Sequence, residues 1–258
     1  MKKPFLLLAL ALALSVQPLF AQDFTGRRRE IKIEPPQERL SVGEELTYSV
    51  EWLGIPVLKV RLQVKEIKEV SGKECYHLLA TAAPNDFFRM FYDVEHKVDS
   101  YIDTKTFLPV RFEKSRCEKN ICSDLLMEFD REKNEAKISS DNIKTVKIQQ
   151  NTLDLLSVIY YMRHLGLKEG GTYSANILYP QKTWPISITV KNAFLKDIRK
   201  KGTFSVIEII PNTDLVGYLL DRRGAEAFFT ADSKRIPILF IMNTKFGLLR
   251  GIIEDLPR

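Results

Sequence analysis

The sequence predicts a mainly β protein, built as a curved antiparallel sheet or an open barrel with one buried helix at about residues 152–165. Three observations predict this fold class. Apolar and polar residues alternate with a period of two over several short segments, turn-forming residues separate these segments, and a single stretch near the middle of the chain has a helical pattern.

The alternating segments are the expected strands. Residues 46–52 and 58–64 place an apolar side chain at every second position, with polar or charged residues between them. The same alternation recurs in 94–102, 108–112, 186–190, 204–210, 225–231 and 246–253. Strands of this kind bury one face and expose the other to water, which favours an antiparallel sheet with a single apolar face.

Repeated motifs indicate that the sheet consists of two similar β-meanders. Residues 43–49 resemble 170–174, and residues 101–110 resemble 230–238. The expected halves, at about 41–140 and 168–258, would share one core, so that 41–258 forms a single β-rich domain. Coincidence between short motifs in a β-rich chain is the alternative.

The helical segment lies in the link between the two halves. Asn151 or Thr152 is expected to cap its start, and Gly166 follows its end. Because few of its positions are polar, the helix is expected to be buried nearly all round. Asp154 and Arg163 must find buried partners and are expected to tie the helix to the surrounding strands, with a contact to a ligand head group as the alternative.

Residues 1–21 are typical of a cleavable signal peptide. Lys2 and Lys3 precede an apolar run, Pro18 follows it, and Ala21 supplies a small residue at the cleavage position. The run is shorter than the roughly 20 apolar residues that span a bilayer, although an uncleaved membrane anchor is the alternative. The sequence therefore predicts an exported protein of the periplasm or the cell exterior.

Residues 22–40 are expected to form a flexible leader, basic and proline-containing. The formal net charge of the whole chain is +6, but basic and acidic residues alternate along the strands instead of forming a stripe, so no nucleic-acid partner is expected. Arg27, Arg28 and Arg29 belong either to a solvated tether or to a peripheral contact with anionic lipid.

The chain has three cysteines, at positions 75, 117 and 122. Four residues separate Cys117 from Cys122, and both flanks are strand-like, so the two could face each other across a hairpin and form a disulfide. Cys75 is then left over and is expected to be a buried small apolar residue.

Three motifs, in this order along the chain, resemble a known family. They are residues 43–57, residues 154–163 and the Asp232 to Pro237 turn. Together they resemble a family of exported bacterial proteins known as domain of unknown function 3108, over roughly residues 40–255. The resemblance implies an exported β-rich protein and assigns no catalytic residues. A more distant likeness, in architecture only, is to the periplasmic lipoprotein carriers, in which a curved sheet wraps an apolar cavity.

No catalytic or metal-binding motif accompanies these features. The histidines at 77, 96 and 164 lack the spacing of a metal site, and no nucleophile elbow, phosphate-binding loop or dinucleotide fingerprint is present, so no cofactor and no metal are expected. His96 alternates in phase with Val94 and Val98 and is expected to face the apolar side of its strand.

An aromatic and methionine-rich segment follows Pro84-Asn85. Such side chains make adaptable apolar contacts with acyl chains or with a partner protein, whereas the alternative is a short helix or lid that plugs the sheet. The candidate ligand-binding residues are those of this segment, His96 and three residues of the helix: Phe87, Phe88, Met90, Phe91, Tyr92, His96, Tyr160, Tyr161 and Arg163.

These features predict a non-enzymatic envelope protein that binds an apolar ligand, such as a lipid or lipid-linked precursor, between sheet and helix. The first alternative is an envelope scaffold or protein-interaction module with a plugged core. The second alternative is an enzyme acting on cell-wall or polysaccharide material, because paired carboxylates can converge in space without showing in the sequence.

Overall fold

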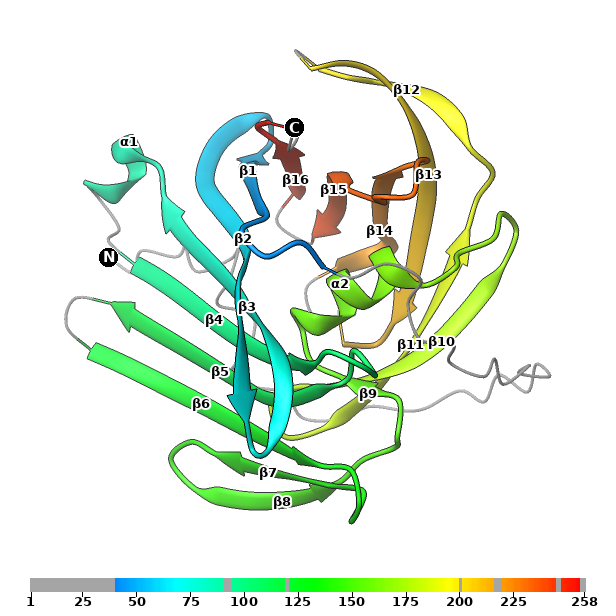
Figure 1. The fold of residues 1–258 in the computed structure, drawn as a ribbon. Helices are drawn as coiled ribbons and strands as arrows, with labels where there is room; N and C mark the ends of the chain where they lie inside the picture. The colour runs from blue at the N-terminus through cyan, green and yellow to red at the C-terminus, as the bar shows by residue number, and fades with distance from the viewer. Residues whose placement is uncertain are drawn as a thin grey trace.

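The computed structural model describes residues 40–90, 94–118, 121–199, 201–215, 220–244 and 247–255. Its strands form one 16-stranded, mostly antiparallel sheet that curves around helix α2 (Ser157–His164) without closing (Figure 1). The predicted fold class, a curved sheet or open barrel around one helix, is therefore confirmed.

The sheet consists of two meanders in which strands adjacent in sequence pair with each other. The strands of the first meander are β1 (Glu45–Trp52), β2 (Ile55–Val70), β3 (Lys73–Pro84), β4 (Val94–Asp103), β5 (Pro109–Glu118), β6 (Ile121–Asp130), β7 (Glu135–Ser139) and β8 (Ile143–Lys147). The strands of the second meander are β10 (Thr172–Leu178), β11 (Thr183–Val190), β13 (Gly202–Thr213), β14 (Leu220–Thr230), β15 (Pro237–Thr244) and β16 (Gly247–Ile253).

One antiparallel pairing joins the two meanders. Strand β1 pairs with β16, with Tyr48 opposite Ile253, so the first and last strands in the sequence lie side by side. The Tyr48 hydroxyl also donates a hydrogen bond of 2.7 Å to the Pro237 carbonyl at the start of β15. Strand β12 (Phe194–Ile198) lies off this path and pairs only with β13.

Tight turns join the first three strands. Leu53 and Gly54 have φ angles of 52° and 85°, and Ser71 and Gly72 have φ angles of 52° and 74°. A positive φ at both central residues is the type I′ geometry, whose twist matches that of the flanking strands. Glycine at the second position makes this geometry accessible at low steric cost.

Helix α2 is shorter than the predicted segment 152–165. Residues 152 and 153 form strand β9 (Thr152–Leu153), which pairs in parallel with Asn176 and Ile177 of β10. The carboxylate of Asp154 then accepts hydrogen bonds of 2.8 Å from the backbone N–H groups of Leu156 and Ser157. The predicted cap at Asn151 or Thr152 is therefore wrong, because Asp154 accepts from the backbone donors at the start of the helix.

The core lies between the concave face of the sheet and α2. Leu156, Tyr160 and Tyr161 pack in one buried cluster with residues of both meanders, among them Tyr76 and Leu78 of β3. Two further clusters lie between β10 and β14 and around β5 to β7. Because each fully buried large apolar side chain stabilises the fold by about 1.5–3 kcal/mol, α2 is an integral part of the core.

Two buried polar contacts tie the helix to the first meander. The Ser100 hydroxyl of β4 donates a hydrogen bond of 2.6 Å to the Asp154 carboxylate. The Arg163 guanidinium donates two hydrogen bonds, of 2.5 and 2.7 Å, to the Glu44 carboxylate just before β1. These are the kind of contacts that the sequence predicts for Asp154 and Arg163.

Candidate functional site

The candidate residues of the aromatic segment lie at the rim of the sheet. They include the short helix α1 (Asp86–Arg89), which lies away from α2 (Figure 1). Phe87 and Met90 are 61% and 74% exposed, while Phe88 is half-buried. Phe91 and Tyr92 lie outside the described residues. This part of the segment therefore does not plug the sheet.

The candidate residues of α2 are buried instead of facing an open surface. Tyr160, Tyr161 and Arg163 all lie in the interior, and burial raises the pKa of Tyr161 to about 12. The Arg163 guanidinium lies 5.4 Å from the centre of the Tyr160 ring and donates two hydrogen bonds to the Glu44 carboxylate. These three side chains hold the helix in the sheet, so the predicted ligand residues do not form one site.

His96 faces the concave side of the sheet, as its alternation predicts. It lies on β4 between Ala82 of β3 and Arg116 of β5 in the strand register. The side chain is 8% exposed, and its Nδ1 atom has no hydrogen-bond partner. Burial, and then the positive charges of Lys114 and Arg116, lower the pKa of His96 to about 4, so the imidazole is neutral at neutral pH.

A basic group accompanies His96 on the same face. Lys114 and Arg116 of β5 follow the fully buried Phe112 at alternate positions and share its face. The Lys114 ammonium donates a hydrogen bond of 2.6 Å to the hydroxyl of Tyr179, which directly follows β10. This contact connects the two meanders across the interior. Neither cation is among the site residues predicted from the sequence, although the phase of both with Phe112 indicates an inward orientation.

Apolar side chains on the concave face differ in how far they are buried. Leu62 of β2 and Leu78 of β3 are buried in the cluster that contains α2. Val60 and Ala80, two positions further along the same strands and on the same face, are only partly buried, as is Val98 of β4. The concave face therefore presents partly exposed apolar side chains next to the basic group.

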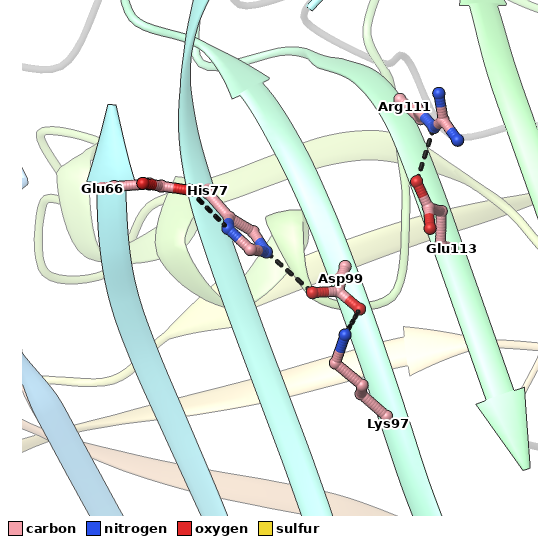
Figure 2. Close-up of polar contacts among 6 residues, drawn as sticks. All are labelled: Glu66, His77, Lys97, Asp99, Arg111 and Glu113. Atoms are coloured by element: carbon pink, nitrogen blue, oxygen red, sulfur yellow. Dashed lines mark hydrogen bonds and ion pairs between the residues drawn. The ribbon is translucent and has the colours of Figure 1, made fainter. Parts of the chain in front are cut away.

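A second polar cluster lies on the opposite face of the first meander. Figure 2 shows Glu66, His77, Lys97 and Asp99 on β2, β3 and β4, with an Arg111–Glu113 ion pair on β5. His77 Nε2 lies 2.7 Å from one carboxylate oxygen of Asp99, and the Lys97 ammonium lies 2.8 Å from the other. Burial alone would raise the pKa of Asp99, but these hydrogen bonds and charges outweigh it and lower the pKa.

The His77–Asp99 pair resembles the base of a catalytic triad, but the groups around it are not activated. Burial raises the pKa of the Cys75 thiol, which is on the same face, to about 11. The Tyr101 ring stacks on His77 at 4.7 Å, and burial also raises the pKa of its hydroxyl. The ion pairs of Glu66, His77 and Lys97, the last two with Asp99, form a cross-strand polar contact between β2, β3 and β4.

The burial of Cys75 and the strand position of Cys117 agree with the sequence prediction. Cys75 is a buried free thiol. Cys117 on β5 is the register partner of Cys122 on β6. The backbone of Cys122 is described but its side chain is not, so the disulfide stays a prediction.

The described part of the chain contains no group of three or more His, Cys, Asp or Glu residues that could hold a metal ion. Within the same residues, no helix has the length and apolar character needed to cross a bilayer.

The fold and the concave face define a barrel-like β protein, with one curved sheet wrapped around an internal helix. The chain belongs to the family described as protein of unknown function (DUF3108), whose model matches residues 47–253. The predicted family resemblance is therefore confirmed. No curated protein matches the chain.

Three solved structures that are similar to this chain have low sequence identity to it. A β-barrel-like protein of domain of unknown function DUF1849 from Brucella abortus is 11% identical, with a TM-score of 0.53 over 86% of this chain and 100% of that chain. A protein from Bacteroides fragilis, described as exported and with a YmcC-like fold, has a TM-score of 0.32 at 8% identity, over 87% of this chain and 100% of that chain. A protein from Parabacteroides distasonis, described as a lipoprotein, has a TM-score of 0.30 at 10% identity, over 84% and 96%. The first likeness shows the fold alone.

Proposed function

We propose that the protein is an exported, non-enzymatic binding protein that holds the apolar chain of an amphipathic molecule on the concave face of its sheet, beside α2. The signal-like residues 1–21 support export to the cell envelope. Neither a metal-ligand cluster nor an activated nucleophile was found among the described residues, and the polar cluster of Figure 2 is accounted for as a cross-strand contact.

One observation carries the proposal. Side chains that share the concave face differ in burial, since Leu62 and Leu78 are covered whereas Val60, Ala80 and Val98 remain partly exposed. Burial of apolar surface is worth about 25 cal/mol per Å², so an acyl chain lying over these residues would gain binding energy without any change in the fold. Apolar surfaces inside barrel-like sheets are common ligand sites.

A second candidate function is supported by the rim of the sheet. Leu53 in the β1–β2 turn and Ile55 at the start of β2 are 60% and 54% exposed, and Phe87 and Met90 are also exposed. The Asn85 side chain donates a hydrogen bond to the Pro56 carbonyl, which places α1 next to this turn. Exposed apolar groups at one end of a fold are typical of protein-interaction sites, as the scaffold alternative requires.

Binding of 1-N-phenylnaphthylamine, a neutral apolar dye, tests the first proposal. Ala80→Trp places a large side chain on the concave face, while Ala83→Trp places the same side chain on the opposite face of the same strand, where Ala83 pairs with Lys59. The wild-type protein and Ala83→Trp are expected to bind the dye, and Ala80→Trp is expected to bind it at least tenfold more weakly. A wild-type protein that does not bind, or an equal effect of the two variants, would contradict the proposal and favour the rim.

A further inference from the structure

We propose that the concave face also carries an anion site, formed by Lys114, Arg116 and His96 with Tyr179 at its border, and that this site binds the carboxylate or phosphate head group of the amphipathic ligand. The inference rests on the proposed function and adds the chemical class of the ligand. It is carried by the placement of these side chains in the sheet.

The strand register places Lys114 within a row of apolar side chains. Ala80 of β3 is opposite Val98 of β4, Val98 is opposite Lys114 of β5, and Lys114 is opposite Leu125 of β6. Directly opposed residues of an antiparallel pair point to the same face, with neighbouring side chains about 5 Å apart. A chain lying on Ala80 and Val98 would therefore bring its end within reach of the Lys114 ammonium.

The adjacent row repeats this order. Ala82 is opposite His96, and His96 is opposite Arg116. The charged groups that act on His96 are the two cations Lys114 and Arg116. The Lys114 ammonium lies on a partly buried face next to a neutral imidazole, where an anion would balance its positive charge.

His96 provides an independent indication of a ligand. It is more than nine-tenths buried, yet its Nδ1 atom has no hydrogen-bond partner. Buried polar atoms are nearly always paired, and an unpaired one leaves a desolvation penalty that a ligand can remove. In the tautomer that carries hydrogen on Nδ1, this atom would donate to an oxygen of the head group.

Lys114 supplies the direct charge contact. Its ammonium has three N–H donors and gives one to the Tyr179 hydroxyl at 2.6 Å. It also lies 5.2 Å from the centre of the Tyr179 ring, so the phenol fixes the position of the charge inside the sheet. The remaining donors can serve a carboxylate or phosphate oxygen, and such charge-assisted hydrogen bonds are stronger than neutral ones.

Two matched probes separate the head group from the chain: cis-parinaric acid, which has a carboxylate, and its methyl ester, which has the same chain without charge. Lys114→Met removes the ammonium and keeps much of the apolar stem, and Lys137→Met removes an exposed lysine of β7 as the control. We expect Lys114→Met to bind the acid at least tenfold more weakly and the ester with unchanged affinity. Lys137→Met should bind both probes as the wild type does.

The other possible outcomes contradict different parts of the proposal. An equal loss of acid and ester in Lys114→Met would overturn the anion site and leave the apolar site standing. Failure of the wild-type protein to bind the ester would contradict the proposed function itself. Inorganic phosphate that displaces the acid at submillimolar concentration would assign the site to a free anion and would overturn the head-group assignment.

A measurement on the wild-type protein covers the case in which Lys114→Met does not fold. The imidazole NMR signals of His96 should shift on addition of the acid and not on addition of the ester. His77 lies on the opposite face of the sheet and serves as the internal control, because its signals should stay in place. Shifts of His96 with both probes, or with neither, would overturn the anion site.

Discussion

Replacing Glu44 by glutamine tests whether its pairing with Arg163 holds α2 in the sheet. The Arg163 guanidinium makes two hydrogen bonds to the Glu44 carboxylate, and the two side chains are only 3% and 13% exposed. Glutamine keeps one acceptor oxygen but leaves the guanidinium charge without its counter-charge in the interior. Breaking a buried ion pair from one side costs about 3–5 kcal/mol, and the retained acceptor favours a loss of about 3 kcal/mol.

The neighbouring residue provides a matched control. Glu45 also pairs with an arginine, Arg61, at 2.9 Å, but these side chains are 41% and 48% exposed. An exposed ion pair contributes at most about 1 kcal/mol, so Glu45→Gln should have a small effect. Urea denaturation followed by circular dichroism measures both free energies of unfolding. If Glu44→Gln loses no more stability than Glu45→Gln, the reasoning about the buried pair is refuted.

Three further predictions concern two buried carboxylates and the cysteines. Burial raises the pKa of Asp154 despite its hydrogen bonds. The contribution of this carboxyl group to stability is therefore present below the unfolded-state pKa and is lost as pH rises through the folded-state pKa. Urea midpoints across the acid pH range should show this trend, and Asp154→Asn should abolish it. For Asp99, the effect of burial on the pKa is outweighed by hydrogen bonds from a histidine and a lysine, so the pKa is lowered. Its contribution to stability is therefore present above the unfolded-state pKa and is lost as pH falls through the folded-state pKa. Asp99→Asn should weaken that acid dependence, and an unchanged slope would contradict the assignment. Alkylation of the unfolded, unreduced protein should give one label by mass spectrometry, on Cys75. After reduction of the predicted Cys117–Cys122 disulfide, three cysteines should be labelled. Three labels without reduction would disprove the disulfide.

The fold class follows from local sequence patterns because each strand buries one face. The alternation that predicts strand 94–102 also places His96 on the inner face, where the structure has it. The start of α2 could not be predicted in the same way. Strand β9 exists because Thr152 and Leu153 pair with Asn176 and Ile177, more than 20 residues away, and this pairing overrides the local helical pattern.

The candidate site was only partly predictable from the sequence. Residues 113–118 are polar or charged apart from Cys117, so only their phase with Phe112 indicates that Lys114 and Arg116 face inward. The contact between Lys114 and Tyr179 joins residues 65 positions apart and depends on the curvature of the whole sheet. The exposed position of Phe87 likewise depends on where the β3–β4 connection leaves the sheet, which residue types alone do not determine.

Native mass spectrometry of the protein, purified gently from its own envelope, tests the central claim most directly. The account predicts a stoichiometric adduct that solvent extraction identifies as an amphipathic molecule with a carboxylate or phosphate head group. A clean unliganded mass that stays unchanged after incubation with envelope lipids would contradict the claim and make the exposed rim around Phe87 and Met90 the leading functional surface.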